Sequence, residues 1–257
     1  MEHGKIETML LDTLERDGAL FFGLIDPMRE IAESLRFARA FSEGGADVIL
    51  MGGSLGIDQA MLNETAKRIK ETVSTPVMLF PGNVDGLTPH ADALYFMCLM
   101  NSSNPYWITG AHALSAFSIK RMGIETIPAS LIIVEPGETV GWIGDAKPVP
   151  LHKPEIAAAY ALAGKMMGHR MTILERGSGA PGPSPPEMFS LVKKAVGHPV
   201  ICAGSQKSLG DIEKTLLGGA DGVHVASLIQ KADNPEAEAK RIIRFVKETG
   251  KKKLKRR

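Results

Sequence analysis

Two short apolar runs in the C-terminal part of the chain, Val200-Ile-Cys202 and Gly222-Val-His-Val225, are separated by a stretch with helical spacing at residues 209–217. This part of the chain therefore reads as strand, helix, strand. Both runs are nearly continuously apolar rather than alternating, which is typical of parallel strands covered on both faces. The same unit can be followed backward through the rest of the sequence.

Six further apolar runs precede this unit, at residues 19–25, 48–51, 77–80, 93–97, 131–134 and 171–174. Helical patterns occupy residues 6–16, 29–44, 57–73, 154–168, 186–196 and 234–249. Eight strands interleaved with helices predict an α/β fold, a TIM (β/α)8 barrel formed as one domain by residues 1–250. A doubly wound sheet is the alternative, but the turn after the first run lacks a G-x-G-x-x-G motif.

One unit of the predicted barrel is irregular. Residues 81–92 hold two prolines and two glycines in twelve positions between the third and fourth runs. Such a segment cannot form a normal helix. The sequence therefore predicts a modified barrel in which a loop replaces the third helix.

The composition excludes several classes of protein. The formal net charge is +1, with 44% hydrophobic and 23% charged residues, which are ordinary values for a globular chain. No apolar run reaches the roughly 18 residues needed to span a bilayer, and the charged start lacks the apolar core of a signal peptide. Two cysteines are too few for a disulfide framework, so we expect a cytoplasmic protein.

The last seven residues, 251–257, form a basic tail with six positive charges. Two interpretations are open. The tail is a solvated, frayed end, or it is a tether to anionic lipid or nucleic acid, since each basic residue near an anionic membrane contributes about 1 kcal/mol.

Small residues follow the last three predicted strands, where a barrel carries its functional groups. They lie at 175–180, 204–205 and 226–227. Small residues let backbone N–H groups converge on an anion, so this pattern predicts a phosphate site, with ordinary tight turns as the alternative. Arg176 and Lys207 either add positive charge there or point to solvent.

Three polar side chains near predicted strand ends are candidates for chemistry. Asp26 follows the first strand and suits Mg²⁺, and Ser54 after the second strand is placed to reach the same ion. The alternative for Asp26 is a helix N-cap. Glu175 is a candidate general base, with a structural ion pair as its alternative.

Longer motifs point to a family. These are Leu24-Ile-Asp-Pro27, Met51-Gly-Gly-Ser54, Leu79-Phe-Pro-Gly-Asn83, Met100-Asn-Ser-Ser-Asn-Pro-Tyr-Trp107, Val134-Glu-Pro-Gly137, Val140-Gly-Trp-Ile-Gly-Asp145, Lys147-Pro-Val-Pro150 and residues 175–181. With them the chain resembles the geranylgeranylglyceryl phosphate synthases of archaea, in their larger subgroup, and the related bacterial heptaprenylglyceryl phosphate synthases. The resemblance covers residues 22–229.

The resemblance implies a Mg²⁺-dependent prenyltransferase of archaeal membrane lipid synthesis. Such an enzyme joins geranylgeranyl diphosphate to the 3-hydroxyl of sn-glycerol 1-phosphate as an ether and releases diphosphate. It also implies a homo-oligomer, a dimer or a hexamer. For the basic tail we expect contact with anionic membranes and no nucleic acid partner.

The resemblance also implies roles for individual residues. Glu175 would be the catalytic base, Asp26 and Ser54 would bind the metal, and Tyr106 and Trp107 would line a groove for the prenyl chain unless they belong to the core. The glycerol phosphate would contact Ile173, Leu174, Glu175, Arg176, Gly177, Ser178, Gly179, Gly204, Ser205, Ala226 and Ser227.

The chain departs from the family pattern in the loops that hold the acceptor. Ile173 stands where the family has a tyrosine, Arg176 where it has alanine, and residues 203–207 replace Gly-Gly-Gly-Ile-Arg. A lost hydrogen bond predicts glycerol phosphate binding weaker by up to roughly tenfold. We expect Arg176 to compensate as a phosphate ligand.

Two other functions stay open because of these departures. One is a prenyltransferase with a different phosphorylated acceptor such as phosphoglycerate, whose carboxylate Arg176 or Lys207 would suit. The other is a phosphate-binding barrel with impaired catalysis, against which the presence of Asp26 and Glu175 argues.

Overall fold

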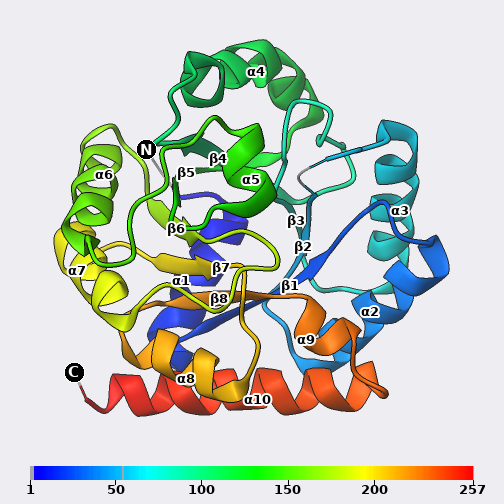
Figure 1. Ribbon diagram of the computed structural model, residues 1–257. Helices are drawn as coiled ribbons and strands as arrows, with labels where there is room; N and C mark the ends of the chain where they lie inside the picture. The colour runs from blue at the N-terminus through cyan, green and yellow to red at the C-terminus, as the bar shows by residue number, and fades with distance from the viewer. Residues whose placement is uncertain (1–2, 54, 257) are drawn as a thin grey trace.

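The computed structural model describes residues 3–53 and 55–256, and within them eight parallel strands close into a barrel in chain order (Figure 1). Strand β8 pairs with β1 and closes the ring. The predicted (β/α)8 barrel is therefore confirmed. The strands are β1 (Leu20–Ile25), β2 (Val48–Met51), β3 (Val77–Leu79), β4 (Ala93–Leu99), β5 (Glu125–Ile133), β6 (Met171–Glu175), β7 (Val200–Ala203) and β8 (Gly222–Val225).

Helices surround the barrel everywhere except between β3 and β4. They are α1 (Lys5–Asp17), α2 (Ile31–Gly44), α3 (Gln59–Thr72), the π-helix η1 (Tyr106–Gly110), α4 (Ala111–Met122), α5 (Glu138–Ile143), α6 (Pro154–Met166), α7 (Pro186–Val196), α8 (Leu209–Leu217), α9 (Ser227–Gln230) and α10 (Pro235–Leu254). Residues 80–92, all of them described, contain no helix, as their prolines and glycines predict.

Side-chain caps mark where several helices begin. The carboxylate of Asp58 accepts a hydrogen bond from the Met61 N–H at the start of α3. Ser208 caps α8 in the same way, and Asn234 caps α10 just before its Pro235. Each cap satisfies an amide that has no partner within its helix. The caps therefore define where each preceding loop ends and the helix begins.

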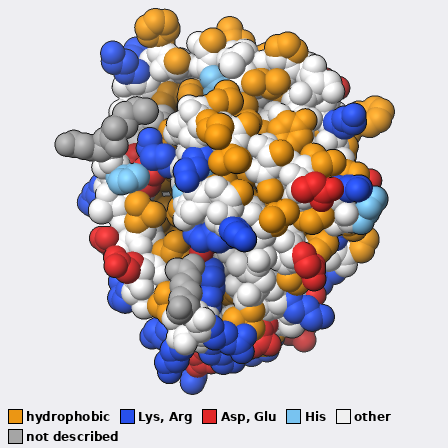
Figure 2. All heavy atoms as spheres, turned by 90° about the vertical axis from the view of Figure 1, so that its left-hand side faces the viewer, with side chains coloured by type: hydrophobic (Ala, Val, Ile, Leu, Met, Phe, Trp, Pro, Cys, Tyr) orange, Lys and Arg blue, Asp and Glu red, His pale blue; other side chains and the backbone are white. Residues whose placement is uncertain are grey.

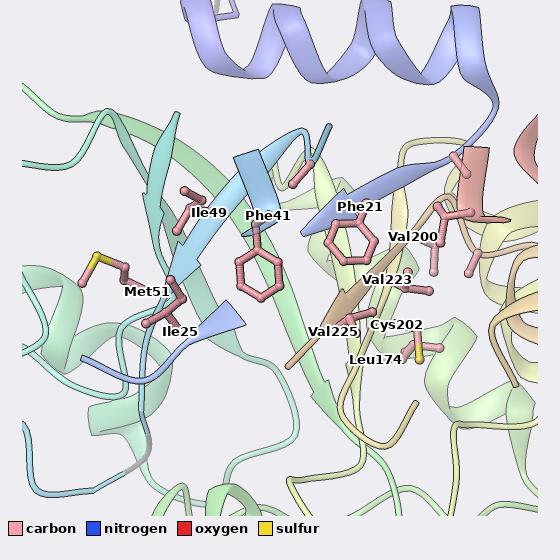
Figure 3. Packing of buried hydrophobic residues seen from close by; sticks show 14 of the residues in the cluster. Phe21, Ile25, Phe41, Ile49, Met51, Leu174, Val200, Cys202, Val223 and Val225 are labelled. Atoms are coloured by element: carbon pink, nitrogen blue, oxygen red, sulfur yellow. The ribbon is translucent and has the colours of Figure 1, made fainter. Parts of the chain in front are cut away.

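Alternate side chains of each strand enter two separate core layers. Ile173 of β6 belongs to the layer inside the barrel, together with Tyr95 of β4. Leu174, the next residue, belongs to the layer between the sheet and the helices, where Phe21 of β1 packs beside Phe41 of α2 (Figure 3). The outward layer attaches the helices, and the inward layer fills the barrel below its mouth.

Helix α10 corrects the expectation of a boundary at residue 250 followed by a frayed tail. It passes through Gly250 without a break, and a Cβ on Gly250 would lie 2.3 Å from the Asp17 carbonyl oxygen. Lys253 is only 8% exposed, and its Nζ lies 2.8 Å from Asp221 Oδ1. A run of basic residues looks solvated in the sequence because its buried counter-charge lies 32 residues away.

Both cysteines, Cys98 and Cys202, are buried and free, as expected from their small number. Within residues 3–53 and 55–256, no helix combines the length and the apolar character needed to cross a bilayer.

Candidate active site

A cavity of about 710 Å³ opens at the carboxyl ends of the barrel strands. Polar residues reach it from β1, β6 and the loops after β7 and β8, whereas apolar residues reach it from β4, η1, α4 and α5. Figure 1 shows α4 and α5 on one side of the barrel mouth and β7 and β8 on the other. The cavity therefore has a polar side, with Asp26, Glu175, Ser178, Gly204, Ser205 and Ser227, and an apolar side, with Phe96, Met97, Leu99, Trp107, Ile119 and Val140.

Glu175 ends β6 and is 6% exposed. Its Oε1 accepts a hydrogen bond from the Gly177 N–H at 2.5 Å. Burial raises the pKa of Glu175 from 4.5 to about 7, although the amides of Gly177 and Arg176 oppose that rise. No lysine, arginine or histidine of the described residues forms a salt bridge with it, so the structural ion pair considered as an alternative is not seen. A carboxyl group half ionised near neutral pH suits a general base.

Two glycines near this carboxyl group have no room for a side chain. Gly204 has φ +75°, and a Cβ there would lie 2.4 Å from Glu175 Oε1. Gly177 has φ +90°, and its Cβ would lie 2.5 Å from Glu138 Cβ. Both positions therefore require glycine on two grounds, a left-handed backbone and a lack of space.

Ser205 also has a left-handed backbone, with φ +60°. The resemblance implies glycine at this position, which would be relaxed there, whereas serine in this left-handed conformation is strained. The Ser205 hydroxyl donates to the Gly177 carbonyl at 3.1 Å and thereby ties the loop after β7 to the loop after β6.

The predicted phosphate residues converge on the cavity. Ser178, Gly179, Gly204, Ser205, Ala226 and Ser227 all line it. Three cations line it as well, Arg29, Lys207 and Lys231. Arg29 contacts Glu33 and Gln230, whereas no salt bridge to Lys207 or Lys231 is found in the described part of the chain. The combination of free basic side chains and converging small residues favours an anionic ligand.

Asp26 lies exposed on the cavity wall just after β1. Its Oδ1 accepts from the Met28 N–H at 2.9 Å, whereas α2 begins after Glu30, so Asp26 is not the N-cap of that helix. The predicted partner Ser54 lies outside the described residues. Among the residues that are described, no three His, Cys, Asp or Glu side chains form a metal site. A single carboxylate at a phosphate-binding cavity still fits Mg²⁺, which usually takes one or two protein carboxylates and completes its shell with water and substrate phosphates.

The two predicted groove residues lie on the π-helix η1 and behave differently. Trp107 lines the cavity. Tyr106 does not, but its hydroxyl donates to Asn83 Oδ1 at 2.6 Å, and Asn83 does line the cavity. The two rings meet edge to face with centroids 4.9 Å apart. Tyr106 therefore supports the wall that Trp107 helps to form.

Comparison with known proteins agrees with this geometry. Residues 13–249 match the PcrB family. The chain belongs to the PcrB family. It is 48% identical over 236 residues to the geranylgeranylglyceryl phosphate synthase of Thermococcus kodakarensis, covering 91% of this chain and 92% of that protein. It is also 48% identical over 242 residues to that of Pyrococcus horikoshii, covering 93% and 94%.

A solved structure is similar over its whole length. The (S)-3-O-geranylgeranylglyceryl phosphate synthase of Thermoplasma acidophilum, in complex with its substrate sn-glycerol-1-phosphate, matches with a TM-score of 0.90 and 31% sequence identity. The match covers 96% of this chain and 100% of that chain. The resemblance stated from the motifs is therefore confirmed at the level of the family.

Within this PcrB chain, Arg176 does not act as predicted. It is 7% exposed and is not among the residues that line the cavity. Its Nε donates to the Glu135 carbonyl at 2.6 Å, and its Nη1 donates to the carbonyls of Gly182 and Pro183. The expectation of a phosphate ligand is corrected, because the guanidinium is already committed to backbone oxygens.

Ile173 and Leu174 are also corrected as substrate-binding residues. Both are 0% exposed and neither lines the cavity. Ile173 packs inside the barrel beneath the mouth, and Leu174 points outward to the helices, because successive side chains of a strand face opposite sides. Only Glu175 of this strand reaches the polar side of the cavity.

Several polar residues that line the cavity were not predicted from the sequence. Tyr95 and His224 are buried, and the Tyr95 hydroxyl lies 3.1 Å from His224 Nε2. Burial lowers the pKa of His224 to about 3, so the ring is neutral. Tyr95 and His224 each lie in an apolar run. Such a run predicts a strand but does not indicate a functional role for a polar atom within it. Lys231 also lines the cavity and was not predicted. The one feature of the sequence that could have indicated it is its position four residues after Ser227.

Proposed function

We propose that this PcrB chain is a geranylgeranylglyceryl phosphate synthase. It would transfer the C20 group of geranylgeranyl diphosphate to the 3-hydroxyl of sn-glycerol 1-phosphate in the cytoplasm, as an ether-forming step of archaeal membrane lipid synthesis. The observation that carries the proposal is the buried Glu175, which has no salt bridge among the described residues and lies between the loops predicted to bind phosphate and an apolar wall. The relatives that share the fold and nearly half of the sequence bear the same name.

The reaction forms one C–O bond and breaks another. The allylic C–O bond ionises as diphosphate leaves, and the acceptor hydroxyl oxygen attacks the allylic carbon. Glu175 takes the hydroxyl proton. With a pKa of about 7, a large share of this carboxyl group is ionised at neutral pH and can accept the proton. Asp26, with Ser54, would hold the Mg²⁺ whose charge compensates the leaving diphosphate.

The chain positions the two substrates from opposite sides of the cavity. Ser178, Gly179, Gly204 and Ser205 offer backbone and hydroxyl groups to the acceptor phosphate, and Lys207 adds positive charge. The apolar side, which includes Trp107, removes the prenyl chain from water at a gain of about 0.8 kcal/mol for each buried methylene. Proximity of the two substrates then favours ether formation over hydrolysis.

The proposal is tested by incubating the protein with Mg²⁺, geranylgeranyl diphosphate and sn-glycerol 1-phosphate and identifying the ether by mass spectrometry. Glu175→Ala should abolish the product, whereas Glu15→Gln, an exposed carboxylate outside the cavity, should not. Chelation of Mg²⁺ should stop turnover. A folded protein that gives no ether would overturn the proposal, and turnover in excess chelator would overturn its magnesium part.

A second candidate is a prenyltransferase for another phosphorylated acceptor. Ile173 is buried and carries no hydroxyl, while Lys207 is exposed on the cavity wall without a salt bridge among the described residues. A free lysine at this place would pair with the carboxylate of 3-phosphoglycerate. A panel of both glycerol phosphate enantiomers and 3-phosphoglycerate, repeated with Lys207→Met, separates the two candidates.

We also propose that the chain forms a homo-oligomer, a dimer or hexamer. Of the eight exposed large apolar side chains among the described residues, three lie on α4 and α5, namely Leu114 at 69%, Phe117 at 76% and Trp142 at 85%. Exposed apolar groups of this size favour burial against another surface. Light scattering of the wild type and of Phe117→Asp should show a smaller assembly for the variant. A monomeric wild type would contradict this.

The end of α10 is proposed to contact anionic membranes. Figure 2 shows Lys and Arg side chains gathered at the lower end of the face on which the chain ends. Lys251, Lys252, Lys255 and Arg256 are exposed. Replacing these four with glutamine should reduce sedimentation with anionic vesicles, and replacing Lys67 and Arg68 should not. Truncation at residue 250 is a poorer test because it would also remove buried Lys253.

A further inference from the structure

Arg176 follows Glu175 directly, yet its side chain leaves the cavity and runs between two loops. The guanidinium is almost fully buried, and its donors reach three backbone carbonyls. Nε donates to Glu135 at 2.6 Å, and Nη1 donates to Gly182 and to Pro183, the latter at 3.1 Å. Glu135 belongs to the loop after β5, whereas Gly182 and Pro183 belong to the loop after β6.

These two loops carry different parts of the cavity. The loop after β6 presents Ser178 and Gly179 on the polar side. The loop after β5 leads into α5, whose Val140 and Ile143 line the apolar side. A backbone hydrogen bond at 3.2 Å, from Gly137 N–H to the Arg176 carbonyl, joins the loops once more.

We propose that Arg176 is a positioning residue that fastens the acceptor-binding loop after β6 to the loop that leads into α5. It holds Glu175 and the amides around Ser178 in place without touching the substrate. A planar guanidinium with several fixed donors can serve carbonyls on two sides, and a lysine ammonium is too compact to span them. This role differs from that of a phosphate ligand, and it explains why a charged side chain is buried here without a carboxylate partner among the described residues.

Loss of this connection should loosen the loop and admit water. The three carbonyls would then be solvated, and water would gain access to Glu175, whose high pKa depends on its burial. The affinity for the acceptor should fall, because Ser178 and Gly179 are no longer held in place. A residue that merely adds stability would leave both the loop and the affinity for the acceptor unchanged.

The first test needs no turnover. Hydrogen exchange of the amides at 177–184 and calorimetric titration with sn-glycerol 1-phosphate are compared in the wild type, Arg176→Ala and Arg176→Lys. Both variants should exchange at least about tenfold faster in this segment and bind about tenfold more weakly, as expected for lost hydrogen bonds to charged donors. Arg39→Ala, an exposed arginine of α2, should match the wild type.

Unchanged exchange at 177–184 together with binding within twofold of the wild type would overturn the proposal. Faster exchange spread evenly over the whole barrel would also overturn it, since that is the result of general destabilisation. If Arg176→Ala does not fold, Arg176→Lys carries the same comparison.

The second test is kinetic and rests on the proposed function. In Arg176→Ala, KM for the acceptor should rise about tenfold, with a smaller change in kcat. A KM within twofold of the wild type, or a fall in kcat larger than the rise in KM, would overturn the positioning role. A wild type without turnover would count against the proposed function, while hydrogen exchange would still decide the role of Arg176.

Discussion

Two buried carboxyl groups stand at opposite ends of the barrel and have opposite surroundings. Asp221 precedes β8 at the amino end and is 0% exposed. Its oxygens lie 2.7 Å from Lys193 Nζ and 2.8 Å from Lys253 Nζ, and one of them also accepts from the Val200 N–H. Glu175 ends β6 at the carboxyl end, is nearly as buried, and has no cation within salt-bridge distance among the described residues.

The difference separates a structural carboxylate from a chemical one. A buried charge needs compensation, and two lysines with a backbone amide supply it for Asp221. Glu175 receives two backbone amides and otherwise responds to burial by a raised pKa. The first arrangement stabilises a fixed charge, and the second leaves a group that can gain and lose a proton.

The largest effect should come from removing the chemical carboxylate. Glu175→Gln keeps the shape and the acceptor for the Gly177 N–H but cannot take a proton. We expect kcat to fall by roughly 10²–10⁴-fold, as for other lost general bases. Steady-state kinetics with circular dichroism as a folding control would show this, and a variant with more than a tenth of wild-type kcat would break the comparison.

Removing the structural carboxylate should damage stability instead. Asp221→Asn removes the negative charge that buried Lys253 and half-buried Lys193 share. The free energy of unfolding should fall by about 3–5 kcal/mol, the usual result of breaking a buried pair. Denaturant titration measures this loss. A fall below 1 kcal/mol would mean that the lysines relax into solvent.

The two carboxyl groups should also differ in the sign of their effect on stability. The folded-state pKa of Glu175 is raised, so its contribution is complete below pH 4.5 and is lost as the pH rises through about 7. Glu175→Gln should therefore be more stable than the wild type at pH 8, by up to about 3 kcal/mol, and equal to it at pH 4. Thermal unfolding at the two pH values tests the sign, and equal stability at pH 8 would contradict it.

The smallest change is to fill the space next to Glu175. In Gly204→Ala the new Cβ would meet Glu175 Oε1, and the backbone at φ +75° would be strained by about 1–3 kcal/mol. Stability and kcat should both fall modestly. Gly45 has a similar φ of +86° but open space around it, so Gly45→Ala measures the cost of the strained backbone without a steric contact. If the two variants have equal kcat, the contact with Glu175 is unimportant.

The sequence predicted the barrel because its strands are buried on both faces, and continuous apolar runs such as residues 48–51 result from that burial. It also predicted the absence of a helix at 80–92, since prolines and glycines act locally. Asp26, Glu175 and Gly204 could be placed at the mouth for a similar reason, as each follows or ends a run. Local patterns were sufficient wherever the structure depends on neighbours in the chain.

The predictions that failed depend on where a side chain points or on partners far along the chain. Ile173 and Leu174 lie in the motif that was expected to bind the glycerol phosphate. Their side chains point instead into the barrel interior and into the layer between the sheet and the helices, respectively. Arg176 was assigned to phosphate, yet its partners include Glu135, 41 residues earlier. Lys253 belongs to the predicted basic tail, yet it is buried and contacts Asp221. Charge and motif identify such residues, but only the packed structure shows what they touch.

The helix that is missing between β3 and β4 has a consequence for how two unlike reactants meet. Phe80, Asn83, Val84 and Leu87 line the cavity from this segment. A helix there would add an outer layer about 10 Å thick, whereas residues 80–92 form only turns and bends. Under the proposed function, this flank without a helix is where a long apolar chain would leave the barrel, apart from the basic side chains that would receive the phosphate groups.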